Sequence, residues 1–562
     1  MRRMVGRGVR VMSVVGAGAL GVAGGVVVPL AAAPPVAAAE LTVDTPDDLA
    51  DATPGDGICG DGSAGSCSLR AAVDEANAVP GADTITVPAG TYVLGLAGAD
   101  EDANVSGDLD VTDSLTIVAS GATLDAAALD RGIDVVAGTV TISGLTITGG
   151  NVPTGLARPG YGGALAVNAG AVAHLDGVSA TGNQAAELGG AFGARNGAQL
   201  DVVGGVLSGN TAPFGGAIGA TFATVAVSGS TVSTNVATKS GGGVFTIGPT
   251  TVTGATVSGN SAGTGWGGGV STILVGPLTV IDSAVADNSA AIAGGTLSFA
   301  ADTTLLRTSV TGNSAGMAGG VGNAHSELDI ETSTVSSNTA DIGSGVYGVG
   351  DAAHPASVGR RRLDHHRQPR RRGGPRGRYR HHRRLAQQHR GRSGDGAGLR
   401  GGGGPASDGF NLDGDGSCNL TQGTDLAATE PILGPLSSTG SRESHALQPG
   451  SPAIDSGAGC DPLDQRHTAR PQHGACDRGA VESRTTYLPF GGAQNYLGTN
   501  TQQSGNWREN TSLAISGTCV SKEQGDLVMP VADWTYSSTT GGSGGAFQNC
   551  TPPTNGTIAN VH

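Results

Sequence analysis

Short runs of the chain alternate apolar or β-branched residues with small or polar ones. Residues 251–258 (TVTGATVS) and 278–285 (LTVIDSAV) are clear examples. Alternation with a period of two residues is typical of half-buried β-strands, and these stretches lack the apolar spacing and capping of a ten-residue helix. The pattern predicts an all-β protein built from short strands.

A short phrase ending in asparagine recurs along the middle of the chain. A glycine pair follows each asparagine by five to seven residues, more loosely after the last. Gly and Asn suit tight corners, and asparagines repeated at one corner can stack as a hydrogen-bonded ladder. The intervals of 27, 25, 25, 28, 25 and 25 residues predict coils of a parallel β-helix. The repeated residues are Asn183, Asn210, Asn235, Asn260, Asn288, Asn313 and Asn338.

The composition agrees with this architecture. The chain has 562 residues, of which 98 are Gly and only 3% aromatic, which does not suit a helical bundle. The glycines have no Gly-X-Y period, so collagen is excluded, and 38% hydrophobic residues are too many for a disordered chain. The coils are predicted over residues 113–405, with a cap needed at each end to block edge pairing.

The charge is negative overall but unevenly distributed. The net charge is -15, although residues 360–400 hold fifteen arginines against two aspartates. The rest of the chain is therefore strongly acidic and repels phosphate backbones and anionic lipid surfaces. Nucleic acid and membrane surfaces are excluded as partners.

The first 39 residues resemble a secretory signal. Four arginines precede an apolar run from Val11 to about Leu30, and Ala37 to Ala39 offer a small-residue cleavage site. Export to the cell surface or medium is expected, with an N-terminal membrane anchor as the alternative. No later segment is long and apolar enough to span a membrane.

The cysteines cluster toward the two ends of the chain. In an oxidising compartment they predict disulfide staples outside the repeats, and none has the C-x-x-C spacing of zinc or thioredoxin-type sites. The expected pairs are Cys59 with Cys67, Cys460 with Cys476 and, in the tail, Cys519 with Cys550, which leaves Cys418 alone.

Both ends resemble known sequence families. Residues 67–78 (CSLRAAVDEANA) and 80–93 (PGADTITVPAGTYV) are similar to the N-terminal module of CSLREA domain-containing proteins, with Ala71 in place of the family's Glu. Residues 69–77 form the one plausible amphipathic helix, a cap on the first coil. Motifs between 406 and 482, such as HALQPGSPAIDSG at 445–457, resemble the choice-of-anchor Q region. The resemblance implies a secreted or surface-displayed right-handed parallel β-helix and no defined reaction.

These features give five predicted regions. They are a signal peptide (1–39), a CSLREA-like cap (40–112), the β-helix (113–405), the choice-of-anchor Q-like region (406–482) and a tail (483–562) that matches no family. Within the β-helix, residues 359–402 break the repeat with runs of Arg and His. The favoured interpretation is a stretch translated out of frame, because a one-base shift over 363–369 can restore Ser-Thr-Ile-Thr-Gly-Asn. The alternatives are a solvated basic loop and a functional basic arm.

Candidate chemistry is sparse. Alternation places Glu327, Asp329 and Glu331 on one strand face, which makes them the best catalytic or metal candidates, against a solvated acidic stripe. Neither His174 nor His325 has a recognisable nucleophile, and both are expected on the surface or in turns.

Calcium is the only cofactor that the sequence suggests. Asn411, Asp413 and Asp415 imitate the start of an EF-hand loop, although Gln422 stands where the bidentate Glu should be. An Asp-Gly turn is the alternative. Two further acidic groups are weaker candidates: Asp51, Asp56 and Asp61 near the first disulfide, and Asp108, Asp110 and Asp113 at the first coil.

The leading functional hypothesis is an exported, non-enzymatic β-helix that adheres or binds polysaccharide along its long face. A polysaccharide lyase or glycoside hydrolase on the same fold is the competitor, and a frame-disrupted product without function is the third hypothesis. The sequence defines neither the ligand, the mode of anchoring nor the oligomeric state.

Overall fold

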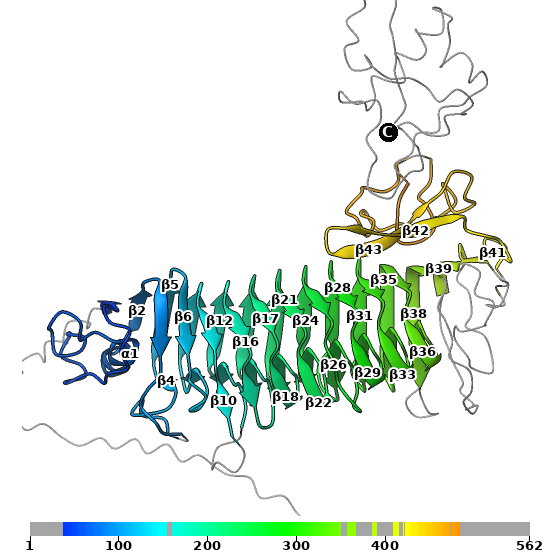
Figure 1. Cartoon of the computed structure of the whole chain (residues 1–562). Helices are drawn as coiled ribbons and strands as arrows, with labels where there is room; N and C mark the ends of the chain where they lie inside the picture. Colours follow the sequence, from blue (N-terminus) through cyan, green and yellow to red (C-terminus); the bar gives the residue numbers. More distant parts are fainter. Residues whose placement is uncertain are drawn as a thin grey trace, which may run out of the picture. The chain divides into compact units, whose positions relative to one another are not determined.

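The computed structural model describes residues 38–99, 101–153, 160–349, 357–366, 385–390, 409–414, 420, 422–472 and 474–483. In this part of the chain the strands stack in parallel, each on its equivalent one coil earlier, and form a right-handed parallel β-helix (Figure 1). The predicted fold class is confirmed. Most of the predicted signal peptide lies outside the described residues, as do Asp415, Cys418 and the tail with Cys519 and Cys550.

One face of the coils is a 22-stranded sheet, the long sheet, which has two columns of strands. Its first column contains β1 (Glu40–Thr42), β2 (Ala82–Val87), β5 (Ser114–Ala119), β8 (Thr139–Ser143), β12 (Val172–Asp176), β16 (Gln199–Val203), β20 (Thr224–Ser228), β24 (Thr250–Thr253), β27 (Leu278–Ile281), β31 (Thr303–Leu306), β35 (Glu327–Ser336), β38 (Ser357–His366) and β39 (Leu385–Arg390). Its second column contains β3 (Gly90–Val93), β6 (Ala122–Asp125), β9 (Thr146–Thr148), β13 (Ser179–Thr181), β17 (Val206–Ser208), β21 (Thr231–Ser233), β25 (Thr256–Ser258), β28 (Ala284–Ala286), β32 (Ser309–Thr311) and the end of β35.

The other two faces complete each coil. The ten-stranded sheet contains β4 (Leu109–Val111), β7 (Ile133–Val135), β11 (Leu165–Val167), β15 (Phe192–Arg195), β19 (Ile218–Thr221), β23 (Val244–Ile247), β26 (Val270–Ile273), β30 (Thr296–Phe299), β34 (Val321–Ala324) and β37 (Val346–Val349). The third face contains β10 (Asn151–Val152), β14 (Gln184–Ala185), β18 (Thr211–Phe214), β22 (Val236–Ser240), β29 (Ser289–Ile292), β33 (Ser314–Met317) and β36 (Thr339–Ile342).

The interior is filled by apolar side chains stacked in register. In the long sheet the inward row runs through Ile85, Ile117, Ile142, Leu175 and their equivalents to Ile330, all almost fully buried. Leu109, Ile133, Leu165 and Phe192 begin the matching row of the ten-stranded sheet. Because the alternate residues point outward, each strand reads as the period-two pattern seen in the sequence.

The repeated asparagines form the predicted ladder inside one corner. The Oδ1 of Asn288 accepts two hydrogen bonds from Asn260, one from its backbone N–H and one from its side-chain Nδ2, both at 2.9 Å. The Nδ2 of Asn288 in turn donates to the carbonyl of Val257 at 2.9 Å. All seven asparagines are buried. Although asparagine tolerates left-handed backbone, these residues do not use it, because positive φ falls on the preceding residue, for example Gly259 (65°) and Asp287 (55°). Asparagine therefore recurs at this position because its side chain forms the ladder, and not because it tolerates left-handed backbone.

The glycine pairs serve two needs. The first glycine of several pairs has positive φ, as at Gly267 (64°). The next lies against the following coil: a Cβ on Gly268 would be 2.4 Å from the carbonyl oxygen of Gly294. One glycine turns the chain and its neighbour lets two coils approach.

The N-terminal cap is built around α1 (Leu69–Ala78), which confirms the predicted helix. Ser68 caps it by accepting the backbone N–H of Ala71 at 3.0 Å. Arg70 is buried, pairs with Asp48 at 2.7 Å and donates to the carbonyls of residues 107 and 108. The predicted Cys59–Cys67 disulfide is present. Stacking begins earlier than residue 113, because β1 and β2 already pair in parallel with the coils.

The described residues between 409 and 483 form the C-terminal cap, which contains the predicted Cys460–Cys476 disulfide. Short pairings connect β40 (Leu412–Asp413) with β41 (Leu426–Ala427) and β42 (Leu433–Thr439) with β43 (Arg442–Leu447). The cap bonds to the outer side of β35: the hydroxyl of Thr334 donates to Gln465 at 2.5 Å, and the hydroxyl of Ser336 is 2.9 Å from Nε2 of His445. It therefore contacts a side of the coils, which the sequence did not indicate.

Asp282 is the charged contact between the coils and this cap. Its carboxylate accepts hydrogen bonds from Arg307 (2.8 Å) and Arg442 (2.9 Å) and lies 2.7 Å from His467. Burial alone would raise the pKa of Asp282, but the hydrogen bonds from Arg307 and His467 hold it below its ordinary value. Because the pKa of Asp282 is lower in the folded protein, its ionised carboxylate stabilises the fold. This stabilisation is complete at pH values above the pKa of the unfolded chain, near 3.8, and is lost as the pH falls through the lower pKa of the folded protein.

We expect Asp282→Asn to loosen the cap at neutral pH. The weakened hydrogen bonds to charged groups should cost about 2 kcal/mol, seen as faster hydrogen exchange of the amides in β43. Wild-type protein should approach the variant's behaviour only at pH well below 4. Asp176→Asn, at an exposed carboxylate of β12, is the control, and equal protection of β43 in both variants would contradict the role of Asp282.

Two strands lie within the Arg-rich segment. β38 pairs in parallel with β35, and β39 with β38, so the backbone there extends the long sheet. The reading-frame hypothesis stays a prediction, which the encoding DNA tests.

Candidate functional site

The outer face of the ten-stranded sheet carries the side chains of most chemical interest. Because inward residues alternate with outward ones, one outward row is paired strand to strand along the whole sheet. Its members are Asp110, Asp134, Ala166, Gly193, Gly219, Phe245, Ser271, Leu297, Gly322 and Tyr347. The row is acidic at its N-terminal end and apolar or aromatic further along.

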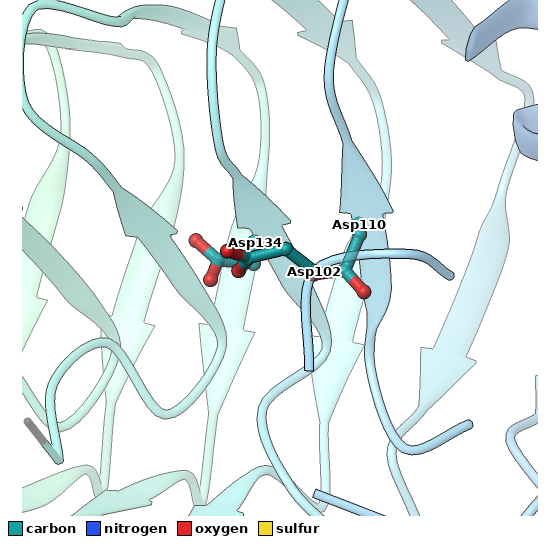
Figure 2. Close-up of side chains that lie close together, drawn as sticks. All are labelled: Asp102, Asp110 and Asp134. Atoms are coloured by element: carbon teal, nitrogen blue, oxygen red, sulfur yellow. The ribbon is translucent and has the colours of Figure 1, made fainter. Parts of the chain in front are cut away.

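The acidic end gathers three carboxylates from two strands and a loop. Asp110 lies on β4, Asp134 on β7 and Asp102 on the loop between β3 and β4 (Figure 2). Each offers one oxygen, and these oxygens lie within 4.8 Å of one another. Among the described residues this is the one group with that geometry, and oxygen-only ligands of this kind suit a hard cation.

The guanidinium of Arg131 neutralises part of this charge. Arg131 is 2.7 Å from Asp134, 3.2 Å from Asp108 and 3.8 Å from Asp130, and all four side chains are buried. Burial raises the pKa of Asp134 and of Asp108, with Arg131 opposing the rise. Burial, then the nearby carboxylates of Glu101 and Asp134, raise the pKa of Asp110 to about 7.

A hydrogen-bonded chain leads from the acidic end toward the aromatic part. Asn168 donates from Nδ2 to Asp134 at 2.5 Å and accepts from the hydroxyl of Tyr161 at 2.5 Å. The guanidinium of Arg195 lies over the Tyr161 ring, 3.4 Å from its centre. Cation–π contact and hydrogen bonds therefore fix the ring.

Aromatic rings continue along the face on successive coils. The rings of Phe214 and Phe245 are 4.9 Å apart, and those of Trp266 and Phe299 are stacked at 6.5 Å. His325 lies edge-on to Phe299 at 5.4 Å. Trp266 is 44% exposed, and Phe222 and Leu274, in the turns that follow this sheet, are 59% and 53% exposed. Together these side chains are here called the aromatic stripe, in which Trp266, Phe222 and Leu274 are exposed and Phe245 is buried.

The predicted site residues lie elsewhere. Glu327, Asp329 and Glu331 alternate along β35 on the outer side of the long sheet, as expected, but they are not among the carboxylates grouped closely enough to hold a metal in the described structure. Their catalytic role stays a hypothesis.

The predicted calcium candidates have other contacts. The backbone N–H and the Nδ2 of Asn411 both donate to Asp425, and Asp413 is buried in the β40–β41 pairing. In the N-terminal cap, acidic side chains accept backbone N–H groups in turns, namely Asp51 from Thr53, Asp56 from Ile58, Asp61 from Ser63 and Asp113 from Ser114. Of these groups, only Asp108 and Asp110 belong to the acidic end. His174 is half-exposed and 2.9 Å from Asp201, and His325 lies in a turn with φ of 56°, as expected for both.

Sequence reasoning missed Asp102, Asp134 and the aromatic stripe. One signal was present: Asp110 and Asp134 are one coil period apart and stand at the same register position. Asp102 lies on a loop outside the repeat, so no period marks it.

No family model and no curated protein matches this chain. Two similar solved structures are pectate lyase Pel9A (14% identity, covering 80% of this chain and 97% of that chain, TM-score 0.30) and the periplasmic alginate epimerase AlgG (11% identity, 50% and 71%, TM-score 0.23). At these TM-scores neither similarity carries an argument about function. Among the described residues no helix is long and apolar enough to cross a membrane.

Proposed function

We propose that this protein is an exported, non-enzymatic β-helix that binds an extended polysaccharide along the aromatic stripe. The observation that carries the proposal is the exposed, stacked ring of Trp266 within a row of aromatic residues on successive coils. Coils rise by about 4.8 Å, a distance comparable to one sugar residue, so a stretched glycan can repeat its contacts from coil to coil.

The chemistry of the stripe suits sugar rings. Aromatic faces bury the apolar C–H faces of pyranoses, while hydroxyl groups at the rim stay hydrated. Lys239, 5.1 Å from the Phe214 ring, adds a donor beside the stripe. The net charge of -15 repels polyanions, which favours a neutral polysaccharide.

The acidic end argues against catalysis. A general acid or base must come within hydrogen-bond reach of the scissile bond. Asp110, Asp134 and Arg131 are all 2% exposed or less, so a sugar ring does not reach them. Release of reducing ends or unsaturated products from a bound polysaccharide would overturn the non-enzymatic part of the proposal.

We expect Trp266→Ala to weaken polysaccharide binding by the full chain roughly tenfold or more, because truncating a central aromatic anchor typically costs about 2 kcal/mol or more. The measurement is a dissociation constant for the best ligand from a panel of neutral, acidic and amino-sugar polysaccharides. Val203→Ala is the matched control: Val203 is 45% exposed but lies on β16 of the long sheet, and its loss should leave affinity unchanged. Binding that is insensitive to Trp266, or silence across the whole panel, would contradict the proposal.

A further inference from the structure

The acidic end holds more buried negative charge than its own cations balance. Four carboxylates there, those of Asp108, Asp110, Asp130 and Asp134, are 2% exposed or less. Arg131 pairs with three of them. Arg70, a buried guanidinium of the cap, pairs with Asp48, and Arg195, which acts on Asp134 electrostatically, lies over the ring of Tyr161. Buried carboxylates without a counter-charge are costly, so this arrangement calls for a further cation or a proton.

Asp110 has one carboxylate oxygen whose hydrogen bonding is incomplete. It is fully buried, and its Oδ2 accepts the backbone N–H of Asn104 at 2.9 Å. Its Oδ1 is also buried and has no hydrogen-bond partner among the described residues. Figure 2 shows this carboxylate close to those of Asp102 and Asp134. A bare carboxylate oxygen beside two other carboxylates is a ready ligand for a metal ion.

We propose that Asp102, Asp110 and Asp134 bind one divalent cation of the calcium type. All three donors are carboxylate oxygens, which favours Ca²⁺ or Mg²⁺ over zinc and other transition metals. Two oxygens on opposite sides of Ca²⁺ are about 4.8 Å apart, from a Ca–O distance of about 2.4 Å, and the carboxylate oxygens here lie within 4.8 Å of one another. Ca²⁺ also tolerates the irregular geometry of a site shared by two strands and a loop, whereas Mg²⁺ demands a near-ideal octahedron.

The position of the site defines what the cation does. Asp110 and Asp134 are on the first two strands of the ten-stranded sheet, and Asp102 lies in a turn that Glu101 organises by accepting the backbone N–H groups of Ala103, Val105 and Ser106. The same loop reaches α1 through Asn104, whose Nδ2 donates to Asp74 at 2.8 Å. A bound cation therefore fastens the N-terminal cap to the first coils and stabilises the end of the β-helix.

The test compares the full chain in chelator and with added Ca²⁺, using calorimetric titration and thermal unfolding. Wild-type protein should bind Ca²⁺ saturably with one site, gain several degrees in Tm, and show slower hydrogen exchange over residues 101–110. Asp110→Asn should weaken Ca²⁺ binding on the order of 100-fold or more. Mg²⁺ should give a smaller gain than Ca²⁺.

The same variant separates a cation ligand from a merely structural carboxylate. In chelator, Asp110→Asn replaces a buried carboxylate that has an unpartnered oxygen while keeping an acceptor for the backbone N–H of Asn104, so its Tm should equal or exceed that of the wild type. A structural role predicts a lower Tm in both conditions. Asp102→Asn, on the loop, provides a second ligand variant, and Asp201→Asn on the long sheet is the control that should bind Ca²⁺ normally. No saturable Ca²⁺ binding by folded wild type, or unchanged affinity in Asp110→Asn, would overturn the proposal.

Discussion

Replacing Asn288 with alanine is expected to lower the free energy of unfolding by about 3 to 6 kcal/mol, because buried groups, chiefly on the preceding coil, lose their partners. The backbone N–H of Asn260 and one of its Nδ2 hydrogens lose the Oδ1 of Asn288, and the carbonyl of Val257 loses the Nδ2. These groups lie inside the coil, where water does not replace the lost bonds. Denaturant unfolding followed by circular dichroism measures the change.

The effect should be greatest next to the substitution. In a stacked-coil protein each coil contacts chiefly its neighbours, so hydrogen exchange should accelerate most between residues 255 and 315. Gln184→Ala removes an amide of similar size from an exposed position beside Asn183 and should change stability by less than about 0.5 kcal/mol. A loss below about 1 kcal/mol for Asn288→Ala would show that the ladder is not a main source of stability.

Gly268→Ala is expected to destabilise the β-helix by about 3 kcal/mol or more, because the added methyl group has no space. Its Cβ would be 2.4 Å from the carbonyl oxygen of Gly294 and 2.6 Å from that of Ser289. Both are backbone atoms of the next coil, which move only if the coils separate. The φ of Gly268 is not in the left-handed region, so the expected loss comes from the clash and not from backbone strain.

Gly316→Ala is the matched control for this clash. Gly316 is exposed on β33 and has no positive φ, and the contact within 4 Å of an added Cβ is the carbonyl oxygen of Ala291 at 3.1 Å. In Gly316→Ala, the cost of this tight contact should be offset by the lower conformational entropy of the unfolded chain, so that the free energy of unfolding changes by less than about 1 kcal/mol. The measurement is the Tm of each variant in thermal unfolding. Equal Tm values would mean that the coils at Gly268 leave room for a methyl group, which would contradict the expected clash.

The sequence was sufficient for the parts of the fold that repeat. Each of three sequence features, the alternation, the asparagine interval and the glycine pairs, follows from one local need of a coil. Because each need recurs in seven coils, the repeated features can be recognised in the sequence. The helix after Ser68 and the two disulfides at the ends could also be predicted, because capping and cysteine proximity are local signals. The residue with positive φ could not be predicted, because a corner offers several adjacent residues and the positive φ falls on Asp287 and not on Asn288.

The candidate sites depend on contacts between distant segments, which explains why sequence reasoning missed them. Asp102 reaches Asp110 and Asp134 only through the path of a non-repeating loop. Trp266 and Phe299 meet because they stand at neighbouring corners of successive coils, 33 positions apart and off the 25-residue interval. The alternation in residues 327–331 places three acidic side chains on one strand face, as predicted, yet such a face does not by itself make a site.

Binding along the aromatic stripe is most directly tested by hydroxyl-radical footprinting of the full chain with and without its best polysaccharide ligand. We expect protection of Trp266, Phe222 and Leu274, with the exposed valines of the long sheet, Val118 and Val203, labelled equally in both states. Protection centred on the long sheet, or no protection of Trp266 at saturating ligand, would contradict this expectation.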